Sequence, residues 1–371
     1  MSYSKNRRTV GVEEELLIVD PRTGMARAVA GVLLRRAAQG APARGDIEFE
    51  LQQQQLEVET SPSSELEQVG RELREWRRHA DNLARETGAR IAALATSPLP
   101  VDPETTFKPR YQQMVERFGL TTTEQLTCGC HVHVSISDDE EGVAVVDRIQ
   151  PWLPVLLALS SNSPFWQGQD SGYASFRTQV WSRLPTAGPT QRFGDAAGYH
   201  RLVEALLASG VLLDEGMIYF NARLSHHYPT VEIRVADICA RVDDAVMIAA
   251  LTRALVETAA HDAAEGVEPD HPNTEQLRLA QWQASRSGLD CQLLDPSSFT
   301  PLPADRVLGE FLDHVGPALD FYGDAELVTD GIARVRRYGT GAALQRDALD
   351  TRGDLAGAVR RLVDVTVEGI D

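Results

Sequence analysis

Four separated stretches of this sequence each place two chemically active side chains two positions apart within an otherwise apolar segment. The four pairs are Glu13 and Glu15, Glu57 and Glu59, His131 and His133, and Glu232 and Arg234. In a β-strand, residues two positions apart point to the same face, so each pair would present both groups to one side. Two carboxylates about 4 Å apart repel by about 4 kcal/mol at an effective dielectric constant near 20, so they require bulk water or a cation. One such strand would be an ordinary solvated face, but four predict a sheet with helices on one side and a polar cavity on the other.

The residue types favour a hard divalent cation. Glutamates with a histidine form an oxygen-rich ligand set suited to Mg²⁺ or Mn²⁺, and such ions commonly lie between protein carboxylates and nucleotide phosphates. A zinc site made of Cys128, Cys130, His131 and His133 is disfavoured, because the spacing does not match the usual zinc motifs and adjacent strand residues point apart. On residue types alone, the sequence predicts a divalent-metal site that takes part in phosphate chemistry.

The connection from residue 170 to residue 193 carries Arg177, Arg183 and Arg192 among glycine, serine, threonine, glutamine and proline residues. Long irregular segments inside a domain often serve as lids or binding loops, and guanidinium groups bind phosphate or carboxylate through paired hydrogen bonds. These arginines could therefore neutralise a phosphoryl group in transfer or orient an acid substrate. An interpretation as ordinary surface arginines fits the sequence equally well.

Strands must position the paired residues. They are predicted over residues 9–20, 55–60, 126–137, 217–225 and 230–237, where β-branched residues and leucines lie between turn signals. On a regular strand Asp237 would face away from Glu232, so we leave it out of the predicted site.

Helices are predicted between and after these strands. One follows a capping box formed by Ser64 and Glu67, and its charged face, which includes Arg77, is expected to be solvated. From Asp243 onward the pattern is helical to the end of the chain. We expect a single α+β catalytic domain over residues 1–371, with a mostly helical C-terminal part from about residue 241.

Composition limits the classes of partner. The chain has 371 residues, of which 36 are basic and 54 acidic, and its formal net charge is −18, which disfavours general binding to nucleic acid or to anionic membranes. We expect no membrane span and no signal peptide, and four cysteines in such a chain suggest reduced thiols in the cytoplasm. The glycine-rich phosphate-binding motifs Gly-x4-Gly-Lys-Ser/Thr and Gly-x-Gly-x-x-Gly do not occur, so phosphate handling would depend on metal and arginine.

The motifs resemble a known family. The elements Gly11-x-Glu13-x-Glu15, Leu56-Glu57, Gly129-x-His131 and Glu232-x-Arg234 occur in the order and approximate spacing of the glutamate–cysteine ligases. The forms Cys-His-Val-His-Val, Val-Glu-Ile-Arg-Val-Ala-Asp and Ser-Arg-Leu-Pro-Thr-Ala-Gly resemble the bacterial carboxylate–amine ligase branch, glutamate–cysteine ligase type 2. The resemblance extends over nearly the whole chain. It implies a glutamine-synthetase-like α+β fold, in which an antiparallel sheet forms a funnel for Mg-ATP and substrate and helices pack on its outer face.

The resemblance also implies roles for individual residues. Metal ligands would be Glu13, Glu15, Glu57, His131 and Glu232. Arg234 would contact the ATP phosphate, with Arg177 and Arg183 as further catalytic arginines. Glu59 and His133 would complete the nucleotide-binding residues.

The implied reaction joins two small molecules. A substrate carboxylate attacks the γ-phosphate of ATP, and an amine captures the acyl phosphate; glutamate and cysteine would be the acid and the amine. A homo-oligomer is compatible with the resemblance. Two alternatives would use the same acids and histidines: a metal-dependent phosphoester hydrolase, and a non-catalytic sensor of nucleotide or metal.

Overall fold

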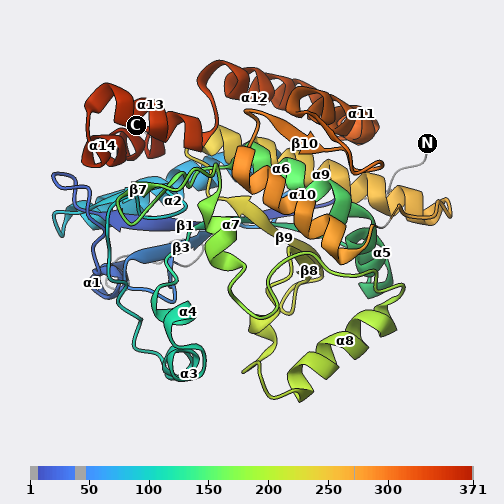
Figure 1. Cartoon of the computed structure of the whole chain (residues 1–371), viewed down its shortest axis with the longest axis horizontal. Helices are drawn as coiled ribbons and strands as arrows, with labels where there is room; N and C mark the ends of the chain where they lie inside the picture. Colours follow the sequence, from blue (N-terminus) through green and yellow to red (C-terminus); the bar gives the residue numbers. More distant parts are fainter. Residues whose placement is uncertain (1–6, 38–46, 271, 370–371) are drawn as a thin grey trace.

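The computed structural model describes residues 7–37, 47–270 and 272–369. At its centre lies an antiparallel sheet with the strand order β2-β3-β1-β5-β9-β8, in which β4 also pairs with β1 (Figure 1). Its strands within the described residues are β1 (Val10–Val19), β2 (Ile47–Phe49), β3 (Gln55–Glu59), β4 (Arg90–Ala92), β5 (Gly129–Ser135), β8 (Ala222–Leu224) and β9 (Thr230–Asp237). The predicted strands that carry the paired residues are therefore confirmed. The strand predicted at residues 217–225 is shorter than expected, because the 3-10 helix η2 (Glu215–Met217) overlaps its start.

Helices cover one face of this sheet. Three apolar residues of the central strands, Val12, Val132 and Ile233, are at most 2% exposed. They face a layer in which α2 and α9 contact β1, and α6 contacts β9. The principal helices on this side are α2 (Leu66–Arg85), α5 (Asp139–Ile149), α6 (Leu153–Ser160), α9 (Val242–Ala264), α10 (Thr274–Ser287), α11 (Ala304–Tyr322), α12 (Ala325–Tyr338), α13 (Gly341–Arg352) and α14 (Leu355–Thr366). A short helix, η1 (Gln150–Trp152), joins α5 to α6, and one hairpin, β10 (Gln292–Leu294) with β11 (Pro301–Pro303), interrupts the helical C-terminal part.

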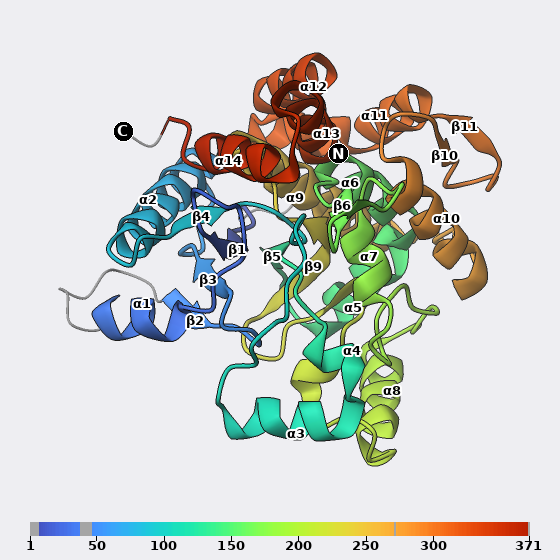
Figure 2. The same ribbon diagram turned by 60° about the vertical axis from the view of Figure 1, so that its left-hand side comes forward.

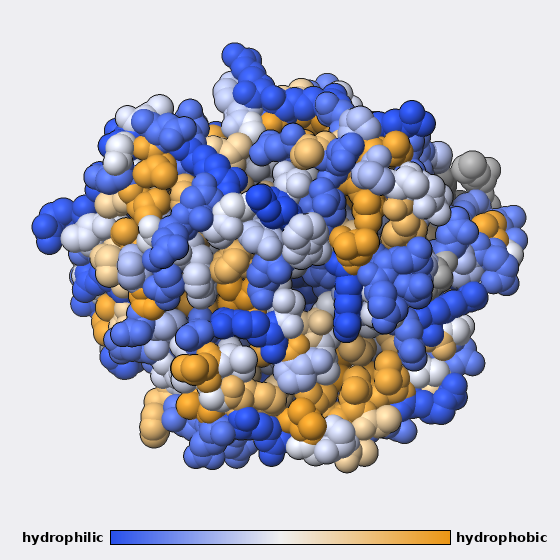
Figure 3. All heavy atoms as spheres, viewed as in Figure 1, coloured by the Kyte–Doolittle hydropathy of each residue, from blue (hydrophilic) through white to orange (hydrophobic). Residues whose placement is uncertain are grey.

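Shorter elements lie on the opposite side of the sheet (Figures 1 and 2). They are α1 (Ala30–Ala37), α3 (Pro109–Phe118), α4 (Leu120–Thr123), α7 (Phe176–Trp181) and α8 (Ala196–Ala208). Between α6 and α7 the chain forms the hairpin of β6 (Phe165–Trp166) and β7 (Gln169–Asp170). The polar side chains of the sheet face this side, so cavities can reach them between the shorter elements. In the same view, Figure 3 shows a mostly hydrophilic surface with separate hydrophobic patches.

A bulge changes the direction of side chains near the end of β9. His133 pairs with Glu232 and Gly129 pairs with Asp237, so four steps along β5 correspond to five steps along β9. An extra residue of this kind reverses the alternation of side chains beyond it. Asp237 therefore points to the same face as Glu232. The expectation that Asp237 faces away from Glu232, which assumed a regular strand, was wrong.

A buried ion pair joins the helical layer to the central strand. The side chains of Arg77 in α2 and Glu14 in β1 are both fully buried and form two hydrogen bonds of 2.8 and 2.6 Å. Arg77 also donates to the carbonyl oxygens of Cys239 and Ala240, at 2.8 and 2.9 Å. The expectation that Arg77 lies on a solvated face was wrong, because its position on α2 faces the sheet, where a carboxylate compensates its charge.

The stretch Asp139–Ser160 is, by length and composition, apolar enough to cross a membrane, but 83% of its apolar 18-residue window is buried inside the protein. It forms α5, η1 and α6 and packs against α9 and β9. Its hydropathy is accounted for by its place in the core.

Candidate active site

Glu13 is the centre of the polar face. It lies on β1 between β3 and β5, directly opposite Glu59 on one side and His131 on the other. Its carboxylate oxygens are 3.1 Å from Nδ1 of His131 and 2.9 Å from Nε2 of His133. Burial opposes ionisation of this carboxyl, but the two imidazoles hold the pKa of Glu13 well below its usual range. Glu13 is therefore an anion at neutral pH, as a metal ligand must be.

The predicted ligands form two overlapping groups that share one histidine. The ligand atoms of Glu13, His131 and Glu232 lie within 4.8 Å of one another, and so do those of Glu15, Glu57 and His131. The structure thus brings together all five residues predicted as metal ligands. Among the described residues, none offers a hydrogen bond to the buried Nε2 of His131.

The second group carries more negative charge than its surroundings compensate. Burial raises the pKa of Glu57 well above its usual value, and Glu50, Glu13 and Glu15 raise it further. Burial and Glu50 also raise the pKa of Glu15, although this carboxylate accepts a hydrogen bond of 2.5 Å from the backbone N–H of Gly129. A divalent cation would relieve this repulsion. Carboxylate oxygens with one imidazole suit Mg²⁺ or Mn²⁺ better than zinc.

Two arginines flank Glu232. Arg223 of β8 donates to it at 2.7 Å, and Arg234 forms a second ion pair with it. Burial opposes ionisation, but these guanidinium groups lower the pKa of Glu232 to about 2. Arg223 was missed by the sequence analysis, although it occupies the strand position directly opposite Glu232. The pairing of two predicted strands across a hairpin was the signal that could have identified it.

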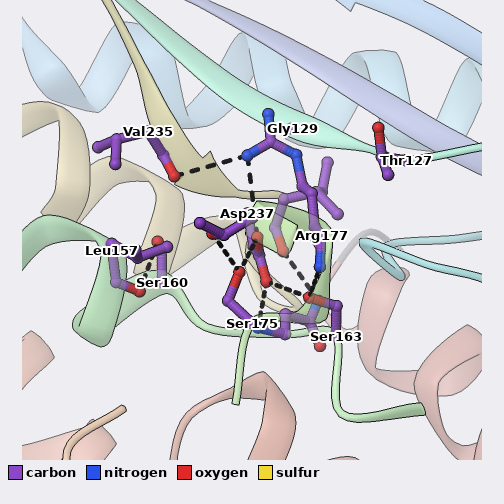
Figure 4. A network of polar contacts seen from close by, with 12 residues as sticks. Thr127, Gly129, Leu157, Ser160, Ser163, Ser175, Arg177, Val235 and Asp237 are labelled. Carbon is purple, nitrogen blue, oxygen red and sulfur yellow. Dashed lines mark hydrogen bonds and ion pairs between the residues drawn. The ribbon is translucent and has the colours of Figure 1, made fainter. Parts of the chain in front are cut away.

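Arg177 of α7 forms an ion pair with Asp237. Its guanidinium is 3.8 Å from the carboxylate of Asp237, which accepts hydrogen bonds of 2.8 Å from the hydroxyls of Ser163 and Ser175 (Figure 4). It also donates weakly to the backbone carbonyls of residues 234 and 235. Glycine at position 129 leaves room for this side chain, because a Cβ atom there would overlap the guanidinium of Arg177 and force it to move.

Trp181, in the last turn of α7, connects the two arginines of the site. The guanidinium carbons of Arg177 and Arg234 each lie 5.6 Å from the centre of its ring. Cations over an indole face are attracted by the ring quadrupole. Trp181 was also missed as a site residue. The one signal in the sequence was its position between arginines in the connection from residue 170 to residue 193.

The other two arginines of this connection do not join the acids. Arg183 forms an ion pair of 2.8 Å with Glu124, and Arg192 lies 3.3 Å from Glu268. Both pairs are at the surface. The surface interpretation therefore fits Arg183 and Arg192, whereas Arg177 occupies the site.

Two cavities open onto the metal-ligand groups. The smaller one, of about 160 Å³, is lined by Glu15, Arg234, Arg110, Trp181 and Tyr219, among others. Its Arg110, on α3, forms two hydrogen bonds with Asp214 at 2.6 and 2.9 Å and gave no signal in the sequence.

The larger cavity, of about 370 Å³, lies at the other end of β1. Its lining includes Glu13, Glu59, His133, Tyr228 and Pro229. Glu59 and His133, predicted to bind nucleotide, therefore face a common space. Glu15 lines the smaller cavity and Glu13 the larger one, so the acid cluster lies between two compartments.

Comparison with known proteins shows extensive similarity. A sequence profile described as glutamate–cysteine ligase family 2 matches residues 9–365. A Streptomyces avermitilis protein provisionally named glutamate–cysteine ligase 2-1 is 52% identical over 359 residues, which cover 97% of this chain and 99% of that protein. A Streptomyces coelicolor relative, provisionally named glutamate–cysteine ligase 2, is 51% identical over 95% of this chain and 99% of its own. The crystal structure of a glutamate–cysteine ligase from Francisella tularensis in complex with AMP superimposes with a TM-score of 0.71 at 13% identity, over 100% of this chain and 91% of that chain, and so shares its fold.

Proposed function

Because this chain belongs to glutamate–cysteine ligase family 2, we propose that it is an ATP-dependent carboxylate–amine ligase. The γ-phosphoryl group of ATP is transferred to the carboxylate of the acid, and the amine then displaces phosphate to form an amide. Glutamate and cysteine are the acid and the amine that the names of its relatives indicate. The observation that carries the proposal is the acid cluster with Arg234 at the junction of two cavities.

The described residues fit a divalent cation. The support is the orphan Nε2 of His131 and the uncompensated charge around Glu57. Glu13, Glu15, Glu57, His131 and Glu232 would hold Mg²⁺ or Mn²⁺. When bound, the cation would neutralise the phosphate oxygens of ATP.

Arg234 is the residue that we assign to the phosphoryl group. It lines the smaller cavity, and its Nη1 is 3.5 Å from Nδ1 of His131. A guanidinium fixed at this point stabilises the negative charge that develops during transfer. Trp181 and the ion pair with Glu232 restrict its movement, so little reorganisation is needed when the substrate reacts.

The two cavities suit different molecules. The smaller contains the cation of Arg110 and the hydroxyls of Tyr111 and Tyr219, groups that can bind the polar ends of an amino acid. The larger is lined by Tyr228 and Pro229, which suit the flat face of a nucleotide base. We assign the acid and the amine to the first cavity and ATP to the second.

Two broader inferences accompany this function. The antiparallel sheet with one polar face is consistent with a glutamine-synthetase-like fold, as the motifs implied. All four cysteines are free thiols. A thiol-containing enzyme that consumes ATP suits the reducing cytoplasm, where we propose that it acts.

The test is to measure ADP and phosphate release from Mg-ATP and glutamate, with and without cysteine, and then with a panel of other amines. Amide formation is followed by mass spectrometry. Arg234→Ala should reduce turnover by a factor of about 10² to 10³, as expected for loss of a group that stabilises transition-state charge. Arg183→Ala is the matched control, because Arg183 lies in the same region but pairs with Glu124.

The outcomes separate the proposal from its alternatives. Release that requires both acid and amine, and that yields the amide, supports the ligase and names its substrates. Phosphate release that ignores the amine would indicate a hydrolase. Binding of ATP without consumption under any combination would indicate a sensor. Equal effects of the two arginine substitutions would refute the role of Arg234.

A further inference from the structure

A further cavity lies among the helices on the apolar side of the sheet, away from the acid cluster. It has a volume of about 880 Å³ and is enclosed by residues of α2, α12, α13 and α14 and by the start of α9. Figure 2 shows α14 to the right of α2, with α13 and α12 above it and further to the right. None of the residues assigned to the ligase site lines this cavity.

Arginines dominate its wall. The six of them are Arg74, Arg241, Arg334, Arg337, Arg352 and Arg361, and the acidic residues of the lining are Asp243, Asp347 and Glu368. Six positive and three negative charges leave this wall with a net charge of +3. The whole chain carries −18, so the local charge is opposite to that of the protein.

Three of the arginines have acidic partners. Arg74 forms an ion pair with Asp243, and Arg334 lies 2.7 Å from Asp244. Arg241 is 3.5 Å from Glu368, whose side chain is 61% exposed.

The other three arginines lack a carboxylate partner of this kind. Within the part of the chain that the structure describes, Arg337, Arg352 and Arg361 form no ion pair with a carboxylate. Their neighbours offer a contrast, since Arg336 pairs with Asp305 and Arg360 with Asp354. The unpaired guanidinium groups come from three different helices and meet at one space.

Arg241 supplies a second indication of a ligand. It is the N-cap residue of α9, its side chain is only 15% exposed, and its Nη1 is buried without a hydrogen-bond partner among the described residues. A buried N–H group of a cation that lacks an acceptor is costly. An anion in the cavity would provide the acceptor.

We propose that this cavity binds an anion with several linked phosphate groups. Guanidinium groups bind phosphate oxygens in pairs, so one phosphate could engage only a part of this wall. A chain of phosphates could engage arginines from α12, α13 and α14 together. The inference goes beyond the ligase reaction and does not depend on it.

Calorimetric titration with inorganic tripolyphosphate tests the proposal. The chelator EDTA is included, so that no divalent cation links the probe to the acid cluster. The variants are Arg352→Ala/Arg361→Ala, and Arg360→Ala as the matched control on the same helix. We expect binding of one tripolyphosphate per chain, weakened at least tenfold in the double variant, and nearly unchanged in Arg360→Ala.

Two further measurements complete the test. Citrate, an anion of similar charge without phosphate, should bind at least tenfold more weakly than tripolyphosphate. Binding should also weaken as salt is raised, because ion pairs are screened. Ligase activity without tripolyphosphate, or ATP binding if no turnover is found, shows that the double variant remains folded. The proposal is overturned if tripolyphosphate does not bind at millimolar concentration, if the double variant binds as tightly as the original protein, if Arg360→Ala weakens binding equally, or if citrate binds equally well.

Discussion

The affinity of the acid cluster for a divalent cation should increase with pH, and Glu57 should be the main reason. The ligand atoms of Glu15 and Glu57 lie no more than 4.8 Å apart. Two like charges at that distance repel by about 3.5 kcal/mol at an effective dielectric constant near 20. Burial, Glu50 and this repulsion all raise the pKa of Glu57. Without metal, the pair therefore retains a proton at a pH where ordinary glutamates are ionised.

A divalent cation has to displace that proton. Below the raised pKa of Glu57, binding that releases one proton lowers the dissociation constant for the metal about tenfold for each unit rise in pH. Above that pKa the dissociation constant no longer depends on pH. The free energy of unfolding of the metal-free protein should change in the opposite direction and decrease as the pH rises. A carboxyl whose pKa is raised by folding favours the folded state below its unfolded pKa, and this contribution is lost as the pH rises through its folded pKa.

The assay is titration of Mn²⁺ by calorimetry between pH 5.5 and 8, in two buffers with different ionisation enthalpies. The difference between the buffers gives the number of protons released. We expect about one proton per ion at the acidic end of this range. Glu57→Gln, which cannot ionise, should bind more weakly and lose most of the pH dependence.

Glu48→Gln is the control for this titration. Glu48 is opposite Glu57 in the sheet but is exposed. It should therefore leave both affinity and proton release unchanged. An affinity independent of pH, or an equal pH dependence in Glu57→Gln, would refute the reasoning.

Three further predictions concern the supports of the site. Arg77→Met should lower the free energy of unfolding by about 3–5 kcal/mol in denaturant titrations, because it leaves Glu14 buried without a counter-charge; a loss below 1 kcal/mol would contradict this. Gly129→Ala should impair turnover more than folding, since its Cβ would displace Arg177, and comparing kcat with the thermal midpoint tests it; unchanged kcat would be the contrary result. Asp237→Asn should cost about 1.5–3 kcal/mol of stability through weaker hydrogen bonds to a neutral group, measured in the same titrations, and a neutral effect would show that its charge is not needed beside Arg177.

The pattern of the sequence was sufficient to predict the strands that carry the paired residues and their polar face, whereas the five proposed metal ligands followed from the resemblance to the glutamate–cysteine ligases. Alternation is a local property, so it can be read from Glu13 and Glu15 without knowing their neighbours. The sheet then brings such pairs together through register, as it does for Glu13 with His131.

Features that depend on long-range geometry could not be predicted in the same way. The bulge in β9, which turns Asp237 toward the site, exists only in relation to β5. Arg110 becomes part of the site through the placement of α3, and Arg223 through the register between β8 and β9. The burial of Arg77 required knowledge of the face of α2 that meets Glu14. The sequence pattern of a single helix or strand does not show which other element will pack against it.

The last helix has a consequence for the order in which this protein can assemble on the ribosome. Every proposed metal ligand lies between residues 13 and 232, yet Thr366 in α14 accepts a hydrogen bond of 2.8 Å from the backbone N–H of Ala93, beside β4. Its carbonyl oxygen also lies 3.4 Å from Nη1 of Arg77. A nascent chain can thus contain all of its ligands while the layer that fixes β1 still lacks its final contacts. Those contacts form only after α14 has left the exit tunnel, so the layer behind the site cannot be completed before that helix has been synthesised.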